Sequence, residues 1–358
     1  MPVVFLLYYA IPHSKRWLFL LISSYYFYMS FKPELIVLIL ISTLIDYYAS
    51  ISMVKYEKYK KYFLSLSICS NLGLLFFFKY FNFFNNAIGD LLKSISIPFT
   101  PTVLNIILPV GISFYTFQTL SYTIDVYRGK IAPERHLGYF ALYVCFFPQL
   151  VAGPIERAEK LLPQFREEHT FNYDNVTYGL KLMAWGFFKK LAVADVVAPY
   201  VNIAYTDVYK HAGLALIVAT LLFSVQIYCD FSGYSDIARG CSKMLGFELM
   251  ENFKSPYLAT NIQNFWQRWH ISLSKWFTDY VYIPLGGKHR YVLCTLVAFA
   301  LSGLWHGANY TYVIWGLING ICIIFYRKFI KKPTNIVETT KKPYIYIYIY
   351  IYTLLKIG

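Results

Sequence analysis

Long apolar runs recur along most of this chain and limit what it can fold into. Two of them, Trp17–Phe31 and Leu35–Met53, are separated only by the short turn Lys32–Glu34. Several runs are long enough to cross a hydrocarbon core of about 30 Å as a helix, and they do not alternate as barrel strands do. Hydrophobic residues make up 57% of the chain and charged residues 15%, against roughly 45–50% and 25% in soluble domains. The sequence therefore predicts an all-α, polytopic membrane protein.

The net charge of +14 is high enough to raise the question of nucleic-acid binding, but its distribution excludes that class. The basic residues flank apolar runs, as in His13–Arg16 and Lys55–Lys61, where membrane topology and anionic lipid account for them. The positive-inside rule places both clusters in the cytoplasm and the turn Lys32–Glu34 outside. The apolar stretch Val3–Ile11 has neither a basic lead nor a small-residue cleavage site, so no cleavable signal peptide is predicted.

Three segments do not fit simple spans. Lys79–Pro101 is less hydrophobic and is predicted to lie at the interface. Ile106–Ile124 carries Gln118 and several hydroxyls, which indicates that it lines a polar interior. Leu137–Ala152 has basic loops on both sides that favour the same face of the membrane. Because Pro148 interrupts this run, we expect a broken or re-entrant segment.

The stretch Asn264–Gly307 concentrates the titratable chemistry. Placed on a helix, its first part gathers apolar and aromatic residues with His270 on one face, while Arg268 and Lys275 fall on the other. After a Pro–Gly–Gly break, a second apolar run ends at His306, with Ser302 one turn before it. The residues predicted to share the first face are Trp266, Trp269, His270, Leu273, Trp276, Phe277 and Tyr280.

An ionisable group at the end of an apolar span is costly, so His306 is a functional-site candidate. Ser302 and Gly303 are small, and we expect them to leave room beside the imidazole for another group. The six cysteines are scattered without a CxxC pair and are interpreted as buried small hydrophobes. His270 and His306 lack a third ligand at useful spacing, so no metal site is predicted.

A second polar cluster, Asp230, Ser232 and Asp236, directly follows the apolar run Gly213–Cys229. Its carboxylates either bond polar groups of the site or satisfy backbone at a helix end, and the sequence leaves both interpretations open. The pair Lys189–Lys190 lies between apolar stretches, where snorkelling to the headgroups is the expected behaviour.

The C-terminal segment differs from the rest. Tyr344–Tyr352 strictly alternates Tyr and Ile, the peptide that a repeated TA dinucleotide encodes in one frame. We therefore predict a single membrane-embedded domain over residues 1–330 and treat residues 331–358 as a low-complexity tail. Our hypothesis is that the chain after about Pro343 is read out of frame at a slippage-prone tract. Mixed Tyr and Ile codons there would contradict it.

These motifs bear a resemblance to a known family. The chain resembles the membrane-bound O-acyltransferases, in the branch that contains alginate and peptidoglycan O-acetyltransferases. Two of the matching stretches are FWQRWHISLSKWF and SGLWHGANYTYVIWG. All the matching stretches follow the family order: Ser42–Ser50, Leu108–Gly129, Phe146–Arg157, Tyr228–Ala238, Phe265–Phe277, Tyr282–Gly287 and Ser302–Gly316.

The sequence departs from the family pattern in two places. Members usually begin with a further apolar lead and continue with further spans, so we expect this chain to be shortened at both ends. Members often have Asn and Arg after the YIPLGG glycines, where this chain has Lys288–Arg290, a loop change that we expect to be tolerated.

The resemblance implies an acyltransferase whose essential histidine is His306. It also implies a ring of helices around a funnel in which a cytoplasmic acyl thioester meets an acceptor from the other side. The chemistry of the residues agrees, because a neutral imidazole suits removal of the hydroxyl proton as attack proceeds. The family motif gives His270 a catalytic or orienting role, the alternative being a buried, satisfied histidine. No Ser or Cys lies in a nucleophile elbow, so direct transfer is preferred to an acyl-enzyme.

The expected co-substrate is acetyl-CoA, with no bound cofactor. Arg268, Lys275 and Arg157 are candidates for attracting its phosphates, with contact to lipid headgroups as the alternative. The expected partners are membrane lipid, a polysaccharide or peptidoglycan acceptor, and an extracytoplasmic acetyltransferase- or esterase-like protein. The expected location is the inner membrane of a bacterium. Three rival functions stay open: D-alanyl transfer to teichoic acid from a carrier protein, an inactive truncated family member, and a transporter.

Overall fold

A computed structural model describes residues 1–330 of the chain. The tail 331–358, with the frame-slippage hypothesis that concerns it, lies outside the described residues. Every regular element of the described part is helical. Four helical stretches are long and apolar enough to cross a membrane: Pro33–Lys55, Glu57–Ser94, Gly213–Met244 and Tyr310–Ile330. The prediction of an all-α, polytopic membrane protein is confirmed.

The described chain forms two compact units. The first joins Met1–Gly179 to Cys241–Leu249, and the second joins Leu180–Gly240 to the chain from Met250 onward. The single acyltransferase domain over residues 1–330, and the ring of helices around a funnel, stay predictions.

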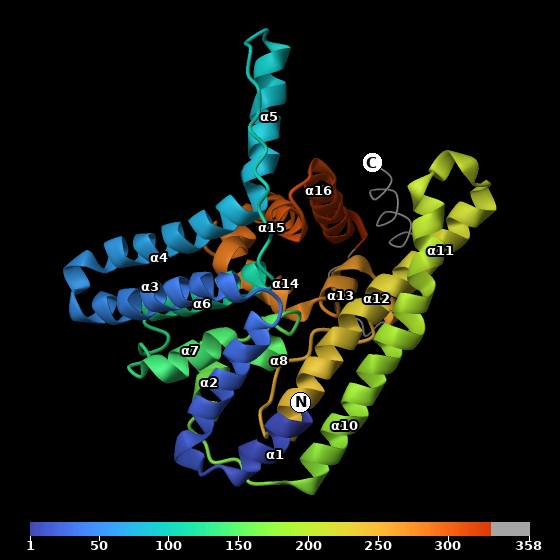
Figure 1. Cartoon of the computed structure of the whole chain (residues 1–358). Helices are drawn as coiled ribbons and strands as arrows, with labels where there is room; N and C mark the ends of the chain where they lie inside the picture. Colours follow the sequence, from blue (N-terminus) through green and yellow to red (C-terminus); the bar gives the residue numbers. More distant parts are fainter. Residues whose placement is uncertain (331–358) are drawn as a thin grey trace. The chain divides into compact units, whose positions relative to one another are not determined.

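Over the described residues, the first unit contains nine complete α-helices, the start of α10 and the last turn of α12 (Gly213–Met244). Figure 1 shows α3, α4 and α6 side by side, in blue to teal. The helices are α1 (Pro2–Ala10), α2 (His13–Met29), α3 (Ile36–Lys55), α4 (Lys60–Leu75), α5 (Phe81–Ser94), α6 (Ile112–Tyr127), α7 (Leu137–Cys145), α8 (Phe147–Leu150), α9 (Ala158–Gln164) and the first part of α10 (Tyr173–Phe187).

A buried carboxylate joins α3, α4 and α6. Asp46 of α3 is fully buried. Asn71 Nδ2 lies 2.8 and 2.9 Å from its two oxygens, and Ser67 Oγ donates to Oδ1 at 2.6 Å. Ser67 also lies 3.1 Å from the hydroxyl of Thr123 on α6. Because polar side chains bond across helices where no water reaches them, this cluster fixes how the three helices pack.

The interrupted segments behave largely as their composition indicates. Most of α6 is buried, and Gln118 donates to the carbonyl of Tyr143 at 2.6 Å, so the helical part of Ile106–Ile124 is interior as predicted. The prediction is wrong for the start of the segment, where Ile107 and Leu108 are exposed. Leu137–Ala152 is broken at Phe146 into α7 and α8, as predicted. Its re-entrant course, and the interfacial position of Lys79–Pro101, stay predictions. The second of these segments forms α5, which continues from α4 through a π-helical turn, Phe76–Tyr80.

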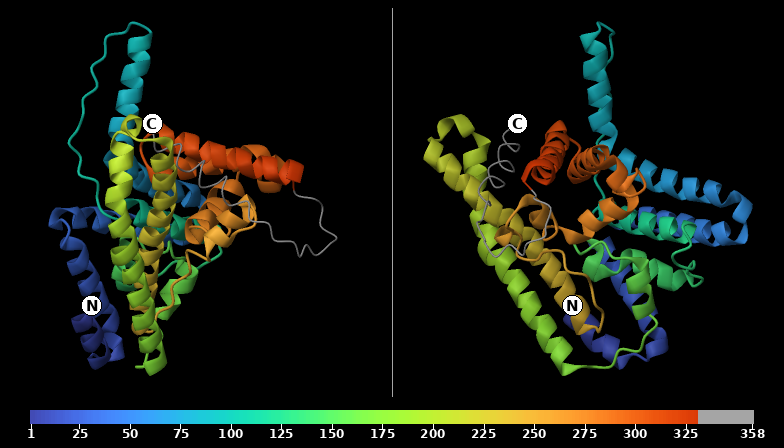
Figure 2. Two further views of the ribbon diagram at one scale, coloured as in Figure 1. Left: turned by 90° about the vertical axis from the view of Figure 1, so that its right-hand side faces the viewer. Right: turned by 180° about the vertical axis from the view of Figure 1, so that it is seen from behind.

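The second unit contains one group of helices formed by the end of α10, α11 and α12, and another formed by α13 to α16. Figure 2 shows α12 alongside the end of α10 and α11 from two further sides. The helices that begin in this unit are α11 (Asp195–Thr206), α12 (Gly213–Met244), α13 (Ile262–Trp266), α14 (Ile271–Phe277), α15 (Tyr291–His306) and α16 (Tyr310–Phe325).

Small residues allow close helix contact in this unit. A Cβ placed on Gly303 of α15 would lie 2.1 Å from the carbonyl oxygen of Tyr312, and one on Gly316 of α16 would lie 2.1 Å from that of Phe299. The two glycines therefore let α15 and α16 approach backbone to backbone. This corrects the expectation that Gly303 leaves free space beside His306, because α16 fills that space.

Candidate active site

A cavity of about 500 Å³ lies within the second unit. Its walls come from α13, α14, α15 and α16 and from the turn after α14. Both predicted histidines line it, together with Ser302, Ser274 and Thr278. The cavity is therefore a largely apolar space into which a few polar groups converge, the usual character of a ligand site.

His270 lies in the interruption between two helices. The expectation of one amphipathic helix through Trp266–Tyr280 is wrong, because α13 ends at Trp266 and α14 begins at Ile271. Between them His270 takes a left-handed conformation, with φ +43° and ψ 56°. Few residues other than glycine adopt this region, and where the surrounding contacts impose it the site is often functional.

The ring of His270 is enclosed by aromatic side chains. It is 1% exposed, with the edge of Phe231 at 4.6 Å and the rings of Trp305 and His306 at 5.8 and 6.2 Å between centroids. Neither ring nitrogen has a hydrogen-bond partner within residues 1–330. Burial, and to a lesser extent the neighbouring His306, hold the pKa of His270 well below its ordinary value of 6.5.

His306 is the last residue of α15. Its ring packs edge-on against Trp305 and Trp315, at 5.0 and 5.4 Å between centroids. Ser302 lies one turn earlier on the same helix and lines the same cavity. The ring centroids of His306 and His270 lie 6.2 Å apart, which is too far for a direct hydrogen bond between the two rings, and both rings line the same cavity.

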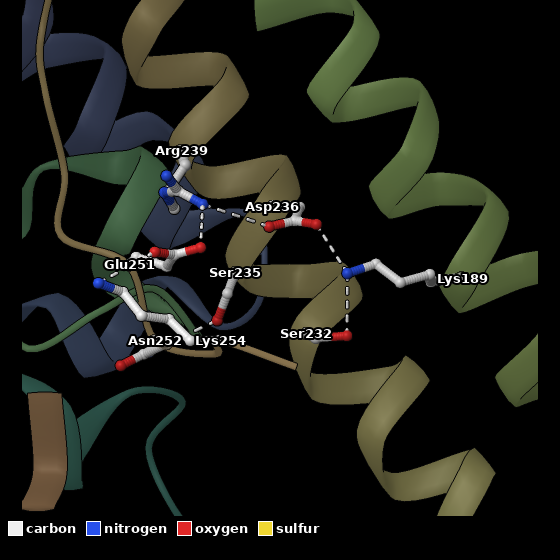
Figure 3. Close-up of polar contacts among 8 residues, drawn as sticks. All are labelled: Lys189, Ser232, Ser235, Asp236, Arg239, Glu251, Asn252 and Lys254. Carbon is white, nitrogen blue, oxygen red and sulfur yellow. Dashed lines mark hydrogen bonds and ion pairs between the residues drawn. The ribbon is translucent and has the colours of Figure 1, made fainter. Parts of the chain in front are cut away.

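The polar cluster on α12 has a different arrangement from the one expected. α12 runs without interruption to Met244, so Asp230 and Asp236 do not end a helix. Lys189 Nζ contacts Asp236 Oδ2 at 2.7 Å and Ser232 Oγ at 2.9 Å (Figure 3). Lys190 Nζ lies 2.6 Å from Asp230. None of the three α12 residues lines the cavity.

These pairs also correct the expectation for the lysines. Lys189 is buried and does not snorkel, because its two partners on α12 satisfy its charge. The sequence does contain a signal for these ion pairs: two adjacent lysines in one apolar segment match two carboxylates in the next. Intramembrane ionisable groups usually pair with one another.

The predicted basic residues separate in the structure. Lys275 lines the cavity, whereas Arg268 lies outside it and is 3.3 Å from the carbonyl of Lys254. Arg157 belongs to the first unit. Sequence reasoning missed Lys288 and Arg327, both of which line the cavity and are exposed.

Two aromatic donors at the cavity were also missed. Trp266 Nε1 and the hydroxyl of Tyr291 are buried, line the cavity and have no hydrogen-bond partner in the described chain. Nothing in the sequence indicated this role, because Trp and Tyr also pack in apolar cores. Over residues 1–330 no group of three metal-ligating side chains occurs.

The fold and the cavity together define a class: a polytopic helical membrane protein with two imidazoles in one largely apolar cavity. The sequence pattern of the membrane-bound O-acyltransferase family (MBOAT) matches residues 135–355. The chain belongs to this family of transferases, which confirms the predicted enzyme class.

The relatives support the predicted branch of the family. The chain is 39% identical to the probable alginate O-acetylase of Pseudomonas putida, over 91% of this chain and 68% of that protein. It is 34% identical to the peptidoglycan O-acetyltransferase of Helicobacter pylori, over 92% and 68%. It is 29% identical to the teichoic acid D-alanyltransferase of Bacillus subtilis, over 64% and 62%. The chain thus spans about two thirds of the length of the O-acetyltransferases it matches.

Proposed function

We propose that this chain transfers an acetyl group from a cytoplasmic thioester, acetyl-CoA, toward hydroxyls of an extracytoplasmic polysaccharide or peptidoglycan. The observation that carries the proposal is the pair of imidazoles in one cavity, 6.2 Å apart. O-acetyl transfer is favoured over D-alanyl transfer because the alginate and peptidoglycan relatives are the more similar ones.

His306 serves as the general base in this mechanism. Its imidazole removes the proton of the acceptor hydroxyl while the hydroxyl oxygen attacks the thioester carbonyl. The carbon–sulfur bond then breaks, and the departing sulfur takes that proton from the imidazolium, so that coenzyme A leaves as a thiol and His306 is neutral again. His270 stays neutral because of its lowered pKa, so one ring nitrogen can donate a hydrogen bond and the other can accept one. His270 orients the acceptor or the carbonyl within the cavity that both rings line. The cavity is largely apolar, which limits competing hydrolysis of the thioester.

The basic side chains at the cavity suit a phosphate-bearing donor. Lys275, Lys288 and Arg327 line the same cavity as the histidines and are exposed. Their positive charge attracts the phosphates of coenzyme A, while the acetyl thioester extends toward the imidazoles. The setting we propose is the inner membrane of a bacterium, with an esterase-like partner outside that passes the acetyl group to the glycan.

Replacement of His306 tests the proposal. We expect His306→Ala to lower acetyl transfer from acetyl-CoA by at least about 100-fold, because general-base catalysis contributes about 10²–10⁴-fold. Glycan acetylation in cells and consumption of the thioester in membranes are both measured. His289→Ala is the matched control, since His289 is exposed and does not line the cavity. Full acetylation by His306→Ala, with normal membrane insertion, would refute the mechanism.

A further inference from the structure

The segment Glu251–Lys254 runs beside the backbone that carries His270. On one side of the histidine, the carbonyl of Arg268 accepts a hydrogen bond from the backbone N–H of Lys254, at 2.9 Å. On the other side, the N–H of Ile271 donates to the carbonyl of Asn252, at 3.0 Å. His270 is therefore fixed by main-chain bonds on both sides.

Asn252 adds a side-chain bond at the same point. Its Oδ1 accepts the backbone N–H of Ser272 at 3.1 Å, which satisfies an N–H in the first turn of α14. Asn252 itself is 1% exposed. The side-chain oxygen of Asn252 thus holds α14 immediately after the left-handed residue, although it lies 18 positions before His270 in the chain.

An ion-pair network ties this segment to α12. Arg239 lies 3.6 Å from a carboxylate oxygen of Asp236 and 3.8 Å from one of Glu251, the residue before Asn252 (Figure 3). Asp236 in turn pairs with Lys189. Phe253, the residue after Asn252, packs edge-on against both Phe231 and Trp269, at 5.1 and 5.0 Å between centroids.

We infer that Asn252 is a positioning residue for His270: its side chain and carbonyl impose the left-handed backbone that turns the imidazole into the cavity. This inference rests on the proposed function, in which that imidazole orients the reacting groups. Without the Oδ1 acceptor, the N-terminus of α14 loses one restraint and the ring samples other directions. A catalytic group displaced by about 1 Å can lower the rate of the chemical step strongly.

The test uses membranes that contain the full-length chain and measures the rate at which they consume acetyl-CoA. We expect Asn252→Ala to lower kcat by about 10-fold or more while KM for acetyl-CoA stays within about twofold, since the donor-binding lysines are untouched. Asn252→Asp keeps an oxygen acceptor for Ser272 and should recover kcat to within about threefold of the wild type. A merely structural role would lower kcat of both variants in step with their thermal stability.

A matched control comes from the same neighbourhood. Ser235→Ala removes only a long contact of 3.5 Å to the Asn252 side-chain nitrogen and should leave kcat unchanged. If Asn252→Ala does not accumulate in membranes, Asn252→Ser, whose hydroxyl is too short to reach Ser272, takes its place with the same expectation. Unchanged kcat in the truncated variant, or an Asp variant as impaired as the Ala variant, would overturn the inference.

The same assay separates this inference from the proposed function. His306→Ala is measured alongside. Activity in that variant would remove the proposed mechanism itself. An inactive His306→Ala together with a fully active Asn252→Ala would remove only the role of Asn252.

Discussion

The two imidazoles of the cavity differ in their surroundings, and the difference bears on their protonation. The ring of His270 is buried against Phe231 and Trp305 in a setting that disfavours charge, and the ring of His306 lies 6.2 Å from it between centroids. His270 also lies outside the four candidate membrane spans. Because the folded protein holds the pKa of His270 below that of the unfolded chain, folding excludes a proton that the unfolded chain binds.

This sets the sign of a pH effect on stability. Above the ordinary pKa of about 6.5 both states are neutral at this residue, and the folded state keeps its full stability. As pH falls below 6.5 the unfolded state gains the proton first, so stability declines by up to about 1.4 kcal/mol per pH unit. Thermal melts of the solubilised chain at pH 7.5, 6.5 and 5.5 measure the decline. His270→Gln should flatten it, and His289→Gln should not. If stability depends equally on pH in the wild type and in both variants, the lowered pKa of His270 is contradicted.

Single residues were predictable where their chemistry contrasts with their neighbours. His306 stands out because an imidazole ends an apolar run, and the structure places it in the cavity with Ser302. Asp46 has the same contrast, but its role in joining three helices depends on Asn71 and Ser67 in the next helix. Asn252 carries no signal of its own, because its partners are two backbone N–H groups near position 271. A role that depends on backbone partners far along the chain leaves no trace in local composition.

At the scale of helices, the apolar periodicity predicted well which segments are helical, but it predicted poorly where those helices are interrupted. The apolar spacing from Trp266 to Tyr280 fits an unbroken helix, yet the backbone turns at His270. The contacts that favour the break come from Asn252, so the local pattern could not contain them. The reverse error occurred at Cys229, where a change to polar residues suggested an end but α12 continues to Met244. There the carboxylates have lysine partners on the neighbouring helix, which removes the cost of continuing.

The contact between α15 and α16 gives a prediction at this scale. Gly303→Ala places a methyl group 2.1 Å from the backbone oxygen of Tyr312, so the two helices must separate. Overpacking of this kind costs about 1–3 kcal/mol. Since His306 ends α15, we expect lower thermal stability together with at least about tenfold less acetyl transfer. Gly73→Ala is the control, because nothing lies within 4 Å of its Cβ position, and a helical Gly→Ala change is neutral or stabilising by up to about 1 kcal/mol. If Gly303→Ala has the thermal stability of the wild type, the two helices accommodate the methyl group and the prediction is wrong.

At the scale of the whole molecule, composition decided more than any motif. The excess of apolar residues and the charge flanking them predicted a polytopic helical protein, and the described chain has four helical stretches able to span a membrane. Family membership followed from several motifs in order, since each matching stretch adds to the specificity of the others. The shape of the cavity could not be predicted, because it arises where α13 to α16 meet and depends on close glycine contacts.

The distribution of basic residues leads to a last prediction, on the direction of the reaction. His13–Arg16 and Lys55–Lys61 flank apolar runs and favour the cytoplasmic face, which is where acetyl-CoA is available. Inside-out vesicles containing the chain should therefore consume added acetyl-CoA, and sealed right-side-out vesicles should do so only after permeabilisation. His306→Ala vesicles of both orientations give the background. A transporter would instead move solute through sealed vesicles without dependence on His306. Equal consumption by the two sealed orientations would contradict a donor bound from the cytoplasm, because acetyl-CoA does not cross the bilayer unaided.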